Sequence, residues 1–190
     1  MNFCSHCGAA VELAIPPGDT LPRHICTRCG TIHYQNPRMV IGCIAEWEGR
    51  ILLCRRAIEP RYGLWTLPAG FMENNETTAA AAIRETQEEA CAEVEIGKLF
   101  ALVNIPHIHQ VHMFYTARLI GGRYGAGSES LESALFAEDE IPWPQLAFRS
   151  VSFALQAWLD DRKRGTFGLH TTDLPPLPPG LPADPSLAAP

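Results

Sequence analysis

The segment GFMENNETTAAAAIRETQEEACA, residues 70–92, carries the densest chemical information in this chain. Four of its five glutamates are placed around a single arginine, Arg84: Glu76, Glu85, Glu88 and Glu89. Like charges at such short spacing destabilise a helix by a few tenths of a kcal/mol per pair, and one arginine does not neutralise four carboxylates. The segment therefore predicts a bound cation, and Mg²⁺ or Mn²⁺ is favoured because these ions take oxygen ligands.

The acidic residues of this segment are expected to share one face of a helix. Residues 78–90 contain no proline or glycine and are rich in alanine and glutamate, with Thr77 as an N-cap. On this helix Glu85, Glu88 and Glu89 stand at i, i+3 and i+4 and therefore point the same way. The preceding TLPAG run predicts a strand end and a turn that bring backbone carbonyls towards the same ion.

The spacing of these residues resembles the Nudix box, in which a glycine, a glutamate and an Arg-Glu-x-x-Glu-Glu run follow at fixed intervals. Six positions fall in that register: Gly70, Glu76, Arg84, Glu85, Glu88 and Glu89. The departures are uncharged and lie at Thr86, Cys91 and Ala92. A solvated acidic helix face is the alternative, but it leaves Gly70 and the spacing of Arg84 unexplained. Because cysteine in a left-handed cap costs about 1 kcal/mol relative to glycine, we expect the helix to end differently at Cys91.

The resemblance implies a fold, an activity and a role for each residue of the box. The fold would be α/β, the Nudix α/β/α sandwich with a mixed sheet, and the activity would be metal-dependent hydrolysis of a nucleoside diphosphate linked to another group X. Glu85 and Glu89 would be the principal metal ligands, and Gly70 would add a backbone carbonyl. Glu88 would be a further ligand or the base. Glu76 would hold Arg84 by an ion pair.

Two Cys-x2-Cys pairs near the N-terminus have the spacing of a zinc ribbon. Eighteen residues separate the pairs, and a glycine follows each one: Cys4, Cys7, Cys26 and Cys29. Four thiolates bind Zn²⁺ tetrahedrally, and a closed shell indicates a structural role because no position is left for water or substrate. A disulfide pair or a redox dithiol is the alternative. Three further cysteines, and an N-terminus that does not resemble a signal peptide, argue against it.

Two further cysteines are expected to be buried apolar residues without a redox function. A two-residue turn at 48–49 would form a hairpin that pairs Trp47 with Arg50. Continuing this register sets Cys43 directly opposite Cys54.

Length and composition fit one core domain with a small metal-bound module. The chain has 190 residues, 46% of them hydrophobic, a formal net charge of −6 and a pI of about 5.6. No apolar run approaches the eighteen or so residues that suggest a membrane span, and the charge balance makes nucleic acid an unexpected partner. Reduced cysteines and the lack of a targeting segment predict a cytoplasmic protein.

The chain is expected to divide into a zinc ribbon at 1–35, a Nudix domain at 36–170 and a flexible tail at 171–190. The tail holds seven of the sixteen prolines and no aromatic residue, so it lacks the side chains for a core. The alternative to a flexible tail is that its LPPLPPGLP stretch forms a polyproline helix, which would bind to an aromatic groove.

Within the Nudix domain, apolar patterns predict a mixed sheet covered by helices. The expected strands are 39–47, 50–56, 99–106 and 110–120. A last helix is expected at 150–164, where apolar residues recur at one-face spacing and Gly165 provides a stop.

Charged residues outside the box are further candidates for the site. The loop GAGSESLESALF offers Glu129 and Glu132 as general base or metal ligand, and Glu129 is favoured by its glycine-rich setting. Solvated loop acids are an equal alternative. Arg55 and Arg56 end a strand on opposite faces, so one of them can reach phosphate, and we assign Arg55 to substrate binding.

Aromatic, proline and histidine residues complete the list of candidates. Trp65 is assigned to stacking on a base, although an aromatic residue beside a strand more often belongs to the core. Pro106 is assigned to substrate binding because it lies close to where ADP-ribose-cleaving members of the family carry a proline. Structural roles are favoured for three histidines that lack companion ligands: His107, His109 and His112.

The substrate assignment rests on finer resemblance. A zinc ribbon before a Nudix domain is shared with NADH pyrophosphatases, but their SQPWPFPxS-type motif after the box is absent. The segments YQNPRMVIGC, GLWTLPAGFME and SLESALFAEDEIPWPQLAF are similar to FAD and ADP-ribose pyrophosphatases. These enzymes release AMP and X-phosphate and are often homodimers. The alternatives are an NADH, nucleoside triphosphate or RNA 5′-end pyrophosphohydrolase and, in another class, a non-catalytic nucleotide-sensing or protein-binding module.

Overall fold

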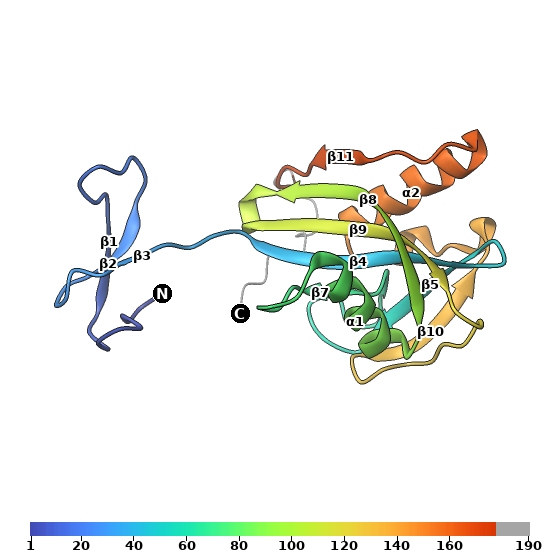
Figure 1. The fold of residues 1–190 in the computed structure, drawn as a ribbon, viewed down its shortest axis with the longest axis horizontal. Coiled ribbons are helices and arrows are strands. Elements are labelled where there is room, and N and C mark those ends of the chain that lie inside the picture. Colours follow the sequence, from blue (N-terminus) through green and yellow to red (C-terminus); the bar gives the residue numbers. More distant parts are fainter. Residues whose placement is uncertain (178–190) are drawn as a thin grey trace. The chain divides into compact units, whose positions relative to one another are not determined.

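The computed structural model describes residues 1–177 (Figure 1). The chain separates into two compact units, one formed by Met1–Pro37 and the other beginning at Arg38. Each unit has its own sheet. Within the described residues, no helix has the length and apolar character needed to cross a membrane.

The first unit is a three-stranded antiparallel sheet in the order β1-β2-β3. Its strands are β1 (Val11–Ala14), β2 (Arg23–Cys26) and β3 (Ile32–His33). The glycines after the two cysteine pairs make the tight turns, because Gly8 and Gly30 have φ values of 73° and 71°. Their N–H groups donate to the carbonyls of the first cysteine of each pair at 2.9 and 3.1 Å.

The second unit is built on a mixed sheet whose main path runs β10-β5-β4-β9-β8-β11. The strand β4 is parallel to β9, and β8 is parallel to β11, whereas the other pairs are antiparallel. The short strands β6 and β7 pair with β5 and β4 outside this path. The strands are β4 (Arg38–Trp47), β5 (Arg50–Arg56), β6 (Trp65–Thr66), β7 (Ala69–Phe71), β8 (Val94–Ile105), β9 (Gln110–Leu119), β10 (Ser130–Phe136) and β11 (His170–Asp173).

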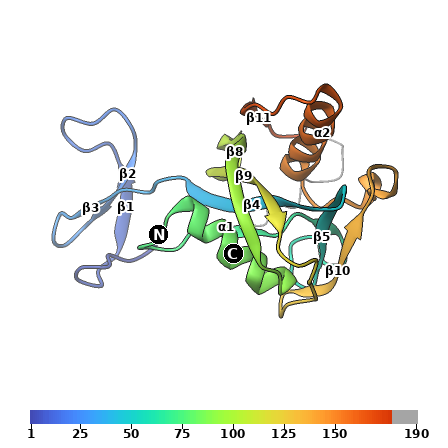
Figure 2. The same cartoon turned by 45° about the vertical axis from the view of Figure 1, so that its right-hand side comes forward.

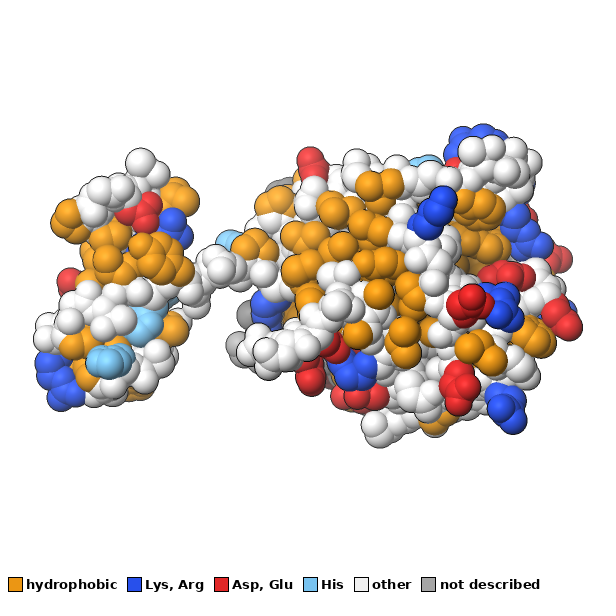
Figure 3. All heavy atoms as spheres, viewed as in Figure 1, with side chains coloured by type: hydrophobic (Ala, Val, Ile, Leu, Met, Phe, Trp, Pro, Cys, Tyr) orange, Lys and Arg blue, Asp and Glu red, His pale blue; other side chains and the backbone are white. Residues whose placement is uncertain are grey.

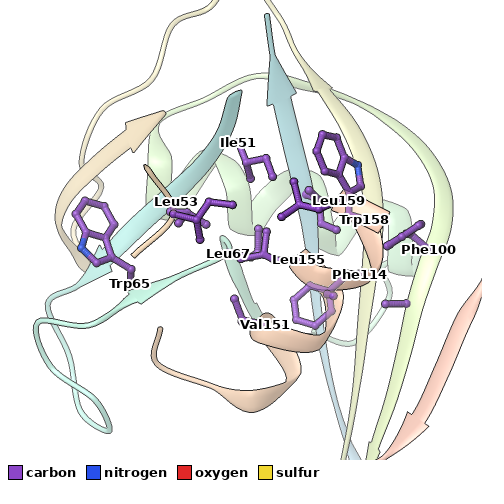
Figure 4. Packing of buried hydrophobic residues seen from close by; sticks show 14 residues of the cluster. Ile51, Leu53, Trp65, Leu67, Phe100, Phe114, Val151, Leu155, Trp158 and Leu159 are labelled. Carbon is purple, nitrogen blue, oxygen red and sulfur yellow. The ribbon is translucent and has the colours of Figure 1, made fainter. Parts of the chain in front are cut away.

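Two long helices cover opposite faces of this sheet, which confirms the predicted sandwich. The helix α1 (Thr78–Ala90) packs on one face and α2 (Arg149–Arg164) on the other (Figures 1 and 2). On the α2 side, apolar residues of the helix pack with Phe100, Phe114 and Leu53 (Figure 4). Short 3-10 helices lie in the connections: η1 (Pro106–Ile108), η2 (Glu138–Glu140) and η3 (Trp143–Gln145).

The hairpin of β4 and β5 confirms the expected register only near its turn. Trp47 pairs with Arg50, as predicted, but beyond the next pair β4 turns to β7 and β5 turns to β6. Cys43 therefore does not lie opposite Cys54, and that prediction is wrong. The inserted strands carry the residues that lead into the acidic segment, which the hairpin pattern alone does not reveal.

Both of these cysteines are buried, as expected. Cys43 contacts the Thr86 hydroxyl at 3.1 Å, and Cys54 accepts a hydrogen bond from the Ser133 hydroxyl at 3.5 Å. Burial raises the pKa of each thiol to about 12, so neither is a reactive thiolate at neutral pH.

The first residues of the predicted flexible tail are part of the sheet. The strand β11 pairs in parallel with β8, with His170 opposite Ala101. Asp161 of α2 accepts hydrogen bonds from the Gly168 N–H at 3.0 Å and from His170 Nε2 at 2.7 Å, which ties this strand to the helix. The tail prediction is therefore wrong for residues 171–173. The part of LPPLPPGLP from residue 178 onward lies outside the described residues.

Candidate active site

The acidic segment forms α1 between the predicted limits. The Thr77 hydroxyl accepts a hydrogen bond from the Ala80 N–H at 3.1 Å and so caps the N-terminus, as expected. Residues Glu85, Glu88 and Glu89 lie in the last two turns. The helix thus brings three of the four carboxylates to one place.

The C-terminus of α1 differs from the prediction. Cys91 adopts the left-handed conformation (φ 47°, ψ 34°), and its N–H donates to the Gln87 carbonyl at 3.0 Å. The expectation that a cysteine would avoid this cap is wrong. The connection between β9 and β10 packs on this helix end, because the Gly125 N–H donates to the Ala90 carbonyl at 2.7 Å.

Arg84 is the centre of the acidic cluster. Its Nε and Nη2 bind the two oxygens of Glu76 at 3.1 and 2.8 Å, so the expected ion pair is present. Nη1 donates to Glu85 at 2.7 Å and to Glu88 at 3.1 Å, while Nη2 also donates to the Phe71 carbonyl at 3.1 Å. Its hydrogen bond to Arg84 lowers the pKa of Glu76. One guanidinium therefore orients three carboxylates.

Two of the carboxylates are buried, which makes their ionised forms costly. Glu85 is 8% exposed and Glu89 is 6% exposed. Burial raises the pKa of Glu89 to about 8, although its Oε2 accepts a hydrogen bond from the Ala69 N–H at 3.0 Å. Burial also raises the pKa of Glu85, against the lowering effect of Arg84. A cation at this position would stabilise both carboxylates.

The backbone of β7 leaves space for the Glu85 carboxylate. A Cβ atom on Gly70 would lie 2.3 Å from Glu85 Oε2, so only glycine allows this close approach. The first predicted residue of the box is therefore required by packing. The clustered oxygen donors and this glycine fit a hard divalent cation.

A glycine-rich segment joins Glu129 to the same region. The Gly127 N–H donates to the Glu89 carbonyl at 3.0 Å, and a Cβ atom on Gly127 would lie 1.7 Å from the Glu88 carbonyl oxygen. The Glu129 carbonyl in turn accepts a hydrogen bond from the Ala57 N–H at 2.8 Å. The loop is thus fixed against the end of α1, and the charge of Glu129 contributes to the raised pKa of Glu89.

The other predicted loop acid, Glu132, is in a strand. The segment expected to be a loop becomes β10 at Ser130, and Glu132 pairs with Arg55 across β10 and β5. Their charged groups are 3.8 Å apart and exposed, and Arg55 Nε donates to the Gly63 carbonyl at 3.0 Å. Arg55 and Glu132 therefore satisfy each other at the surface.

Arg56, which we did not assign, is the strand-end arginine beside the acidic cluster. It is 9% exposed, and its Nε donates to the Pro60 carbonyl at 2.8 Å. Its charge interacts with those of Glu89 and Glu129. Alternation along the strand predicted that the two arginines would face opposite ways, but the sequence held no signal for which face carries the site.

Trp65 belongs to the core rather than to an open stacking surface. It is 8% exposed and lies in the buried cluster of the α2 side (Figure 4). Its ring packs edge to face on Phe136, with ring centroids 4.9 Å apart. Little of the ring is left for a base, so this assignment is corrected.

Pro106 and the histidines lie around the turn between β8 and β9. Pro106 is exposed at the start of η1, and the neighbouring His109 carbonyl accepts a hydrogen bond from the Arg38 N–H at 2.8 Å. His112 is buried and contacts Ser150 and Gln110 at 2.9 Å each, in agreement with a structural role. The ring nitrogens of His107 are buried.

The four ribbon cysteines converge on one point. All four Sγ atoms lie within 4.8 Å of one another, and the Cys4–Cys29 and Cys7–Cys26 separations are 3.8 and 3.4 Å. Tetrahedral zinc with bonds of about 2.3 Å requires sulfur separations of about 3.8 Å, so the cluster is consistent with zinc. A hydrogen bond with the Thr31 hydroxyl lowers the pKa of Cys29 to about 6, which favours the thiolate form.

Family comparison agrees with both sites. A family model described as "NUDIX domain" matches residues 36–155, and one described as "Nudix N-terminal", a zinc ribbon, matches residues 2–35. The chain therefore belongs to the Nudix hydrolase family, whose enzymes need a divalent metal.

Individual relatives differ in substrate. The chain is 30% identical to an ADP-ribose pyrophosphatase of Methanocaldococcus jannaschii over 60% of this chain and 69% of that protein. It is 29% identical to the NAD-capped RNA hydrolase NudC of Photobacterium profundum over 74% of this chain, but the alignment spans only 52% of that protein. A solved Nudix hydrolase from Nitrosomonas europaea is 53% identical, with a TM-score of 0.87 over 92% of this chain and all of the other.

Proposed function

We propose that this chain hydrolyses the diphosphate bond of a nucleoside diphosphate linked to X, with FAD or ADP-ribose as first choice and AMP and X-phosphate as products. The proposal is carried by the carboxylates around Arg84, of which Glu85 and Glu89 are buried with raised pKa values. An anionic diphosphate approaches such a site only when a cation compensates the negative charge. The likeness to an ADP-ribose pyrophosphatase supports this substrate class.

The proposed metal ligands are Glu85 and Glu89, with Glu88 as a further ligand or base and the Gly70 carbonyl as an additional donor. A bound Mg²⁺ or Mn²⁺ ion polarises a phosphoryl oxygen and lowers the pKa of water. Arg84 keeps its carboxylate partners on one side of α1, and Glu76 fixes Arg84 through two hydrogen bonds.

Glu129 is the proposed general base, which takes the proton of the attacking water. The hydrogen bonds of its loop to Ala57 and to the end of α1 support this role, because they hold the residue beside Glu89. Replacing Glu129 by Gln should lower turnover by about 10²-fold or more. An unchanged rate would leave Glu88 as the base.

A second candidate activity is cleavage of NADH, of a nucleoside triphosphate or of an RNA 5′ end. The similarity to NudC supports this second activity, as does the ribbon before the Nudix domain. Its weakness is the absence of the SQPWPFPxS-type motif. Pro106, exposed at its turn, is retained as a substrate contact in either case.

Zinc in the ribbon, a homodimer and a cytoplasmic location complete the proposal. Thiolates that bind zinc must stay reduced, which supports the cytoplasm. The homodimer is supported by partly exposed apolar side chains on the α1 side of the sheet, Leu102, Val111 and Met113, where hydrophobic residues gather over β8 and β9 (Figure 3). Light scattering tests it, and Met113→Glu should yield monomers.

One assay separates these readings. Turnover of FAD, ADP-ribose, NADH, nucleoside triphosphates and NAD-capped RNA is measured with and without Mg²⁺ or Mn²⁺. The variant Glu89→Gln is the control and should lose activity by at least about 10²-fold, because it removes a charged ligand. A higher kcat/KM for FAD or ADP-ribose than for the other substrates supports the first choice. A lack of metal-dependent product from every substrate would point to a non-catalytic module.

A further inference from the structure

Arg56 occupies an unusual position for an arginine at the end of a strand. Its neighbour Arg55 points to solvent and pairs with Glu132, whereas Arg56 is 9% exposed. Buried arginines normally have an anionic partner, because an unpaired buried cation is costly. Within residues 1–177, no carboxylate forms an ion pair with Arg56.

The surroundings of Arg56 fix its orientation. Nε donates to the Pro60 carbonyl at 2.8 Å, and the guanidinium carbon lies 5.0 Å from the centre of the Phe148 ring. The backbone is also fixed, because the Arg56 N–H donates to the Leu64 carbonyl and its carbonyl accepts from the Gly63 N–H. One edge and one face of the guanidinium are therefore occupied. Within the described chain the two Nη groups form no hydrogen bond, and neither is among the buried polar atoms that lack a partner, so both reach the surface.

The strand pairing brings Arg56 to the catalytic carboxylates. Arg56 pairs with Ser130 between β5 and β10, so Glu129 is the residue just before its partner. The Ala57 N–H donates to the Glu129 carbonyl at 2.8 Å, which secures this end of the pairing. Burial lowers the pKa of Arg56, and the charges of Glu89 and Glu129 oppose this effect. The guanidinium thus adjoins the acidic cluster without being neutralised by it.

We propose that Arg56 binds the substrate's diphosphate group through its two Nη donors, beside the proposed metal-binding carboxylates. This assignment rests on the proposed function and adds a residue to it. A guanidinium is planar and presents parallel donors to two phosphate oxygens, and stacking on Phe148 preserves that plane. Arg56 would thereby hold the diphosphate in place while the neighbouring carboxylates act on it.

Binding of inorganic pyrophosphate in the presence of Mg²⁺ tests the assignment without turnover. In calorimetry of the full chain, Arg56→Gln should raise the dissociation constant of pyrophosphate by at least about 10-fold, because two charge-assisted hydrogen bonds are lost. Arg56→Lys should give an intermediate loss, since a point charge replaces the planar fork. Arg118→Gln is the matched control and should bind like the wild type, because Arg118 is an exposed arginine that pairs with Glu95. Adenosine, which lacks phosphate, should bind all four proteins equally.

The outcomes distinguish the two proposals. Equal pyrophosphate affinity of the wild type and a folded Arg56→Gln variant overturns the Arg56 assignment, as does a wild type that binds no pyrophosphate. If the glutamine variant does not fold, Arg56→Lys decides in the same way, because it retains the buried cation. A wild type that binds pyrophosphate through Arg56 but cleaves no dinucleotide overturns the proposed function alone.

Discussion

The ribbon and the acidic site hold two sets of candidate metal ligands that differ in their other partners. In the ribbon, four sulfur atoms lie within 4.8 Å of one another, and no other set of three or more ligating groups among the described residues converges this closely. In the acidic site, Glu85 accepts a hydrogen bond from Arg84 and Glu89 accepts one from the Ala69 N–H, so each of these candidate ligands also has a protein partner.

This difference follows from what stabilises each unit. Within Met1–Pro37 the buried residues are Cys4, Pro16 and Cys26, so the ribbon lacks an apolar core. The second unit has apolar clusters on both faces of its sheet. We therefore expect the ribbon to depend on a bound metal for folding, whereas the acidic site belongs to a domain that folds by apolar burial and does not require an ion for folding.

Removing a ribbon ligand tests this contrast most strongly. Cys26→Ser should abolish zinc binding and unfold residues 1–37, since structural zinc contributes on the order of 10 kcal/mol. Zinc content and amide NMR of the full chain would measure both effects. Cys91→Ser, which changes an exposed cysteine outside the ribbon, should keep its zinc. A ribbon that stays folded without zinc would remove the contrast.

Removing a ligand from the acidic site should have the opposite effect on stability. The pKa of Glu89 rises from its ordinary value of 4.5 to about 8 in the folded chain. Between these values the folded state holds a proton that the unfolded state releases, so the free energy of unfolding falls as pH rises. Above pH 8 the full cost of burying the ionised Glu89 is present, and it lowers the free energy of unfolding by at most roughly 5 kcal/mol.

Glu89→Gln should therefore stabilise the protein at pH 9 without added divalent ions, and should have no such effect below about pH 4.5. Urea unfolding at several pH values provides the measurement. Glu88→Gln is the control, because its side chain is 58% exposed and pays little for burial. A glutamine variant that is less stable than the wild type at pH 9 would show that the buried charge is compensated within the domain.

The packing around Gly70 allows a smaller test of the acidic site. Gly70→Ala places a methyl group within 2.3 Å of the Glu85 carboxylate and should weaken Mg²⁺ binding by about 10-fold or more, because the ligand must move. Gly168→Ala is the matched control, since a Cβ there meets no atom within 4 Å. Calorimetric Mg²⁺ titrations of both variants give the comparison. Equal affinities would mean that Glu85 is free to move without loss.

The sequence allowed good prediction where a local pattern determines the structure. The N-cap at Thr77 followed from its residue type before a helix-forming run, and the pairing of Glu76 with Arg84 followed from the resemblance to the Nudix box. Prediction failed where the position of a residue depends on segments that are distant in the sequence. Which of two adjacent arginines faces the site depends on β10, and the place of Cys43 depends on the inserted β7. Neither placement can be predicted from the residues of β4 and β5 alone.

The smallest expected effect concerns backbone strain in the two regions. Cys91 ends α1 at φ 47°, and Gly30 follows the second cysteine pair at φ 71°. Cys91→Gly should therefore stabilise the second unit by about 1 kcal/mol in urea unfolding.

In the ribbon, Gly30→Ala imposes the same left-handed cost, and a Cβ there meets no atom within 4 Å. We expect the ribbon to fold only when it binds zinc, so that cost should appear as a zinc affinity reduced by about 5-fold, which competition with a chelator measures. An unchanged zinc affinity would indicate that the ribbon is already folded without the ion. The two substitutions thus test the cost of the same left-handed backbone conformation. In the second unit this cost appears as a change in stability, and in the ribbon it appears as a change in zinc affinity.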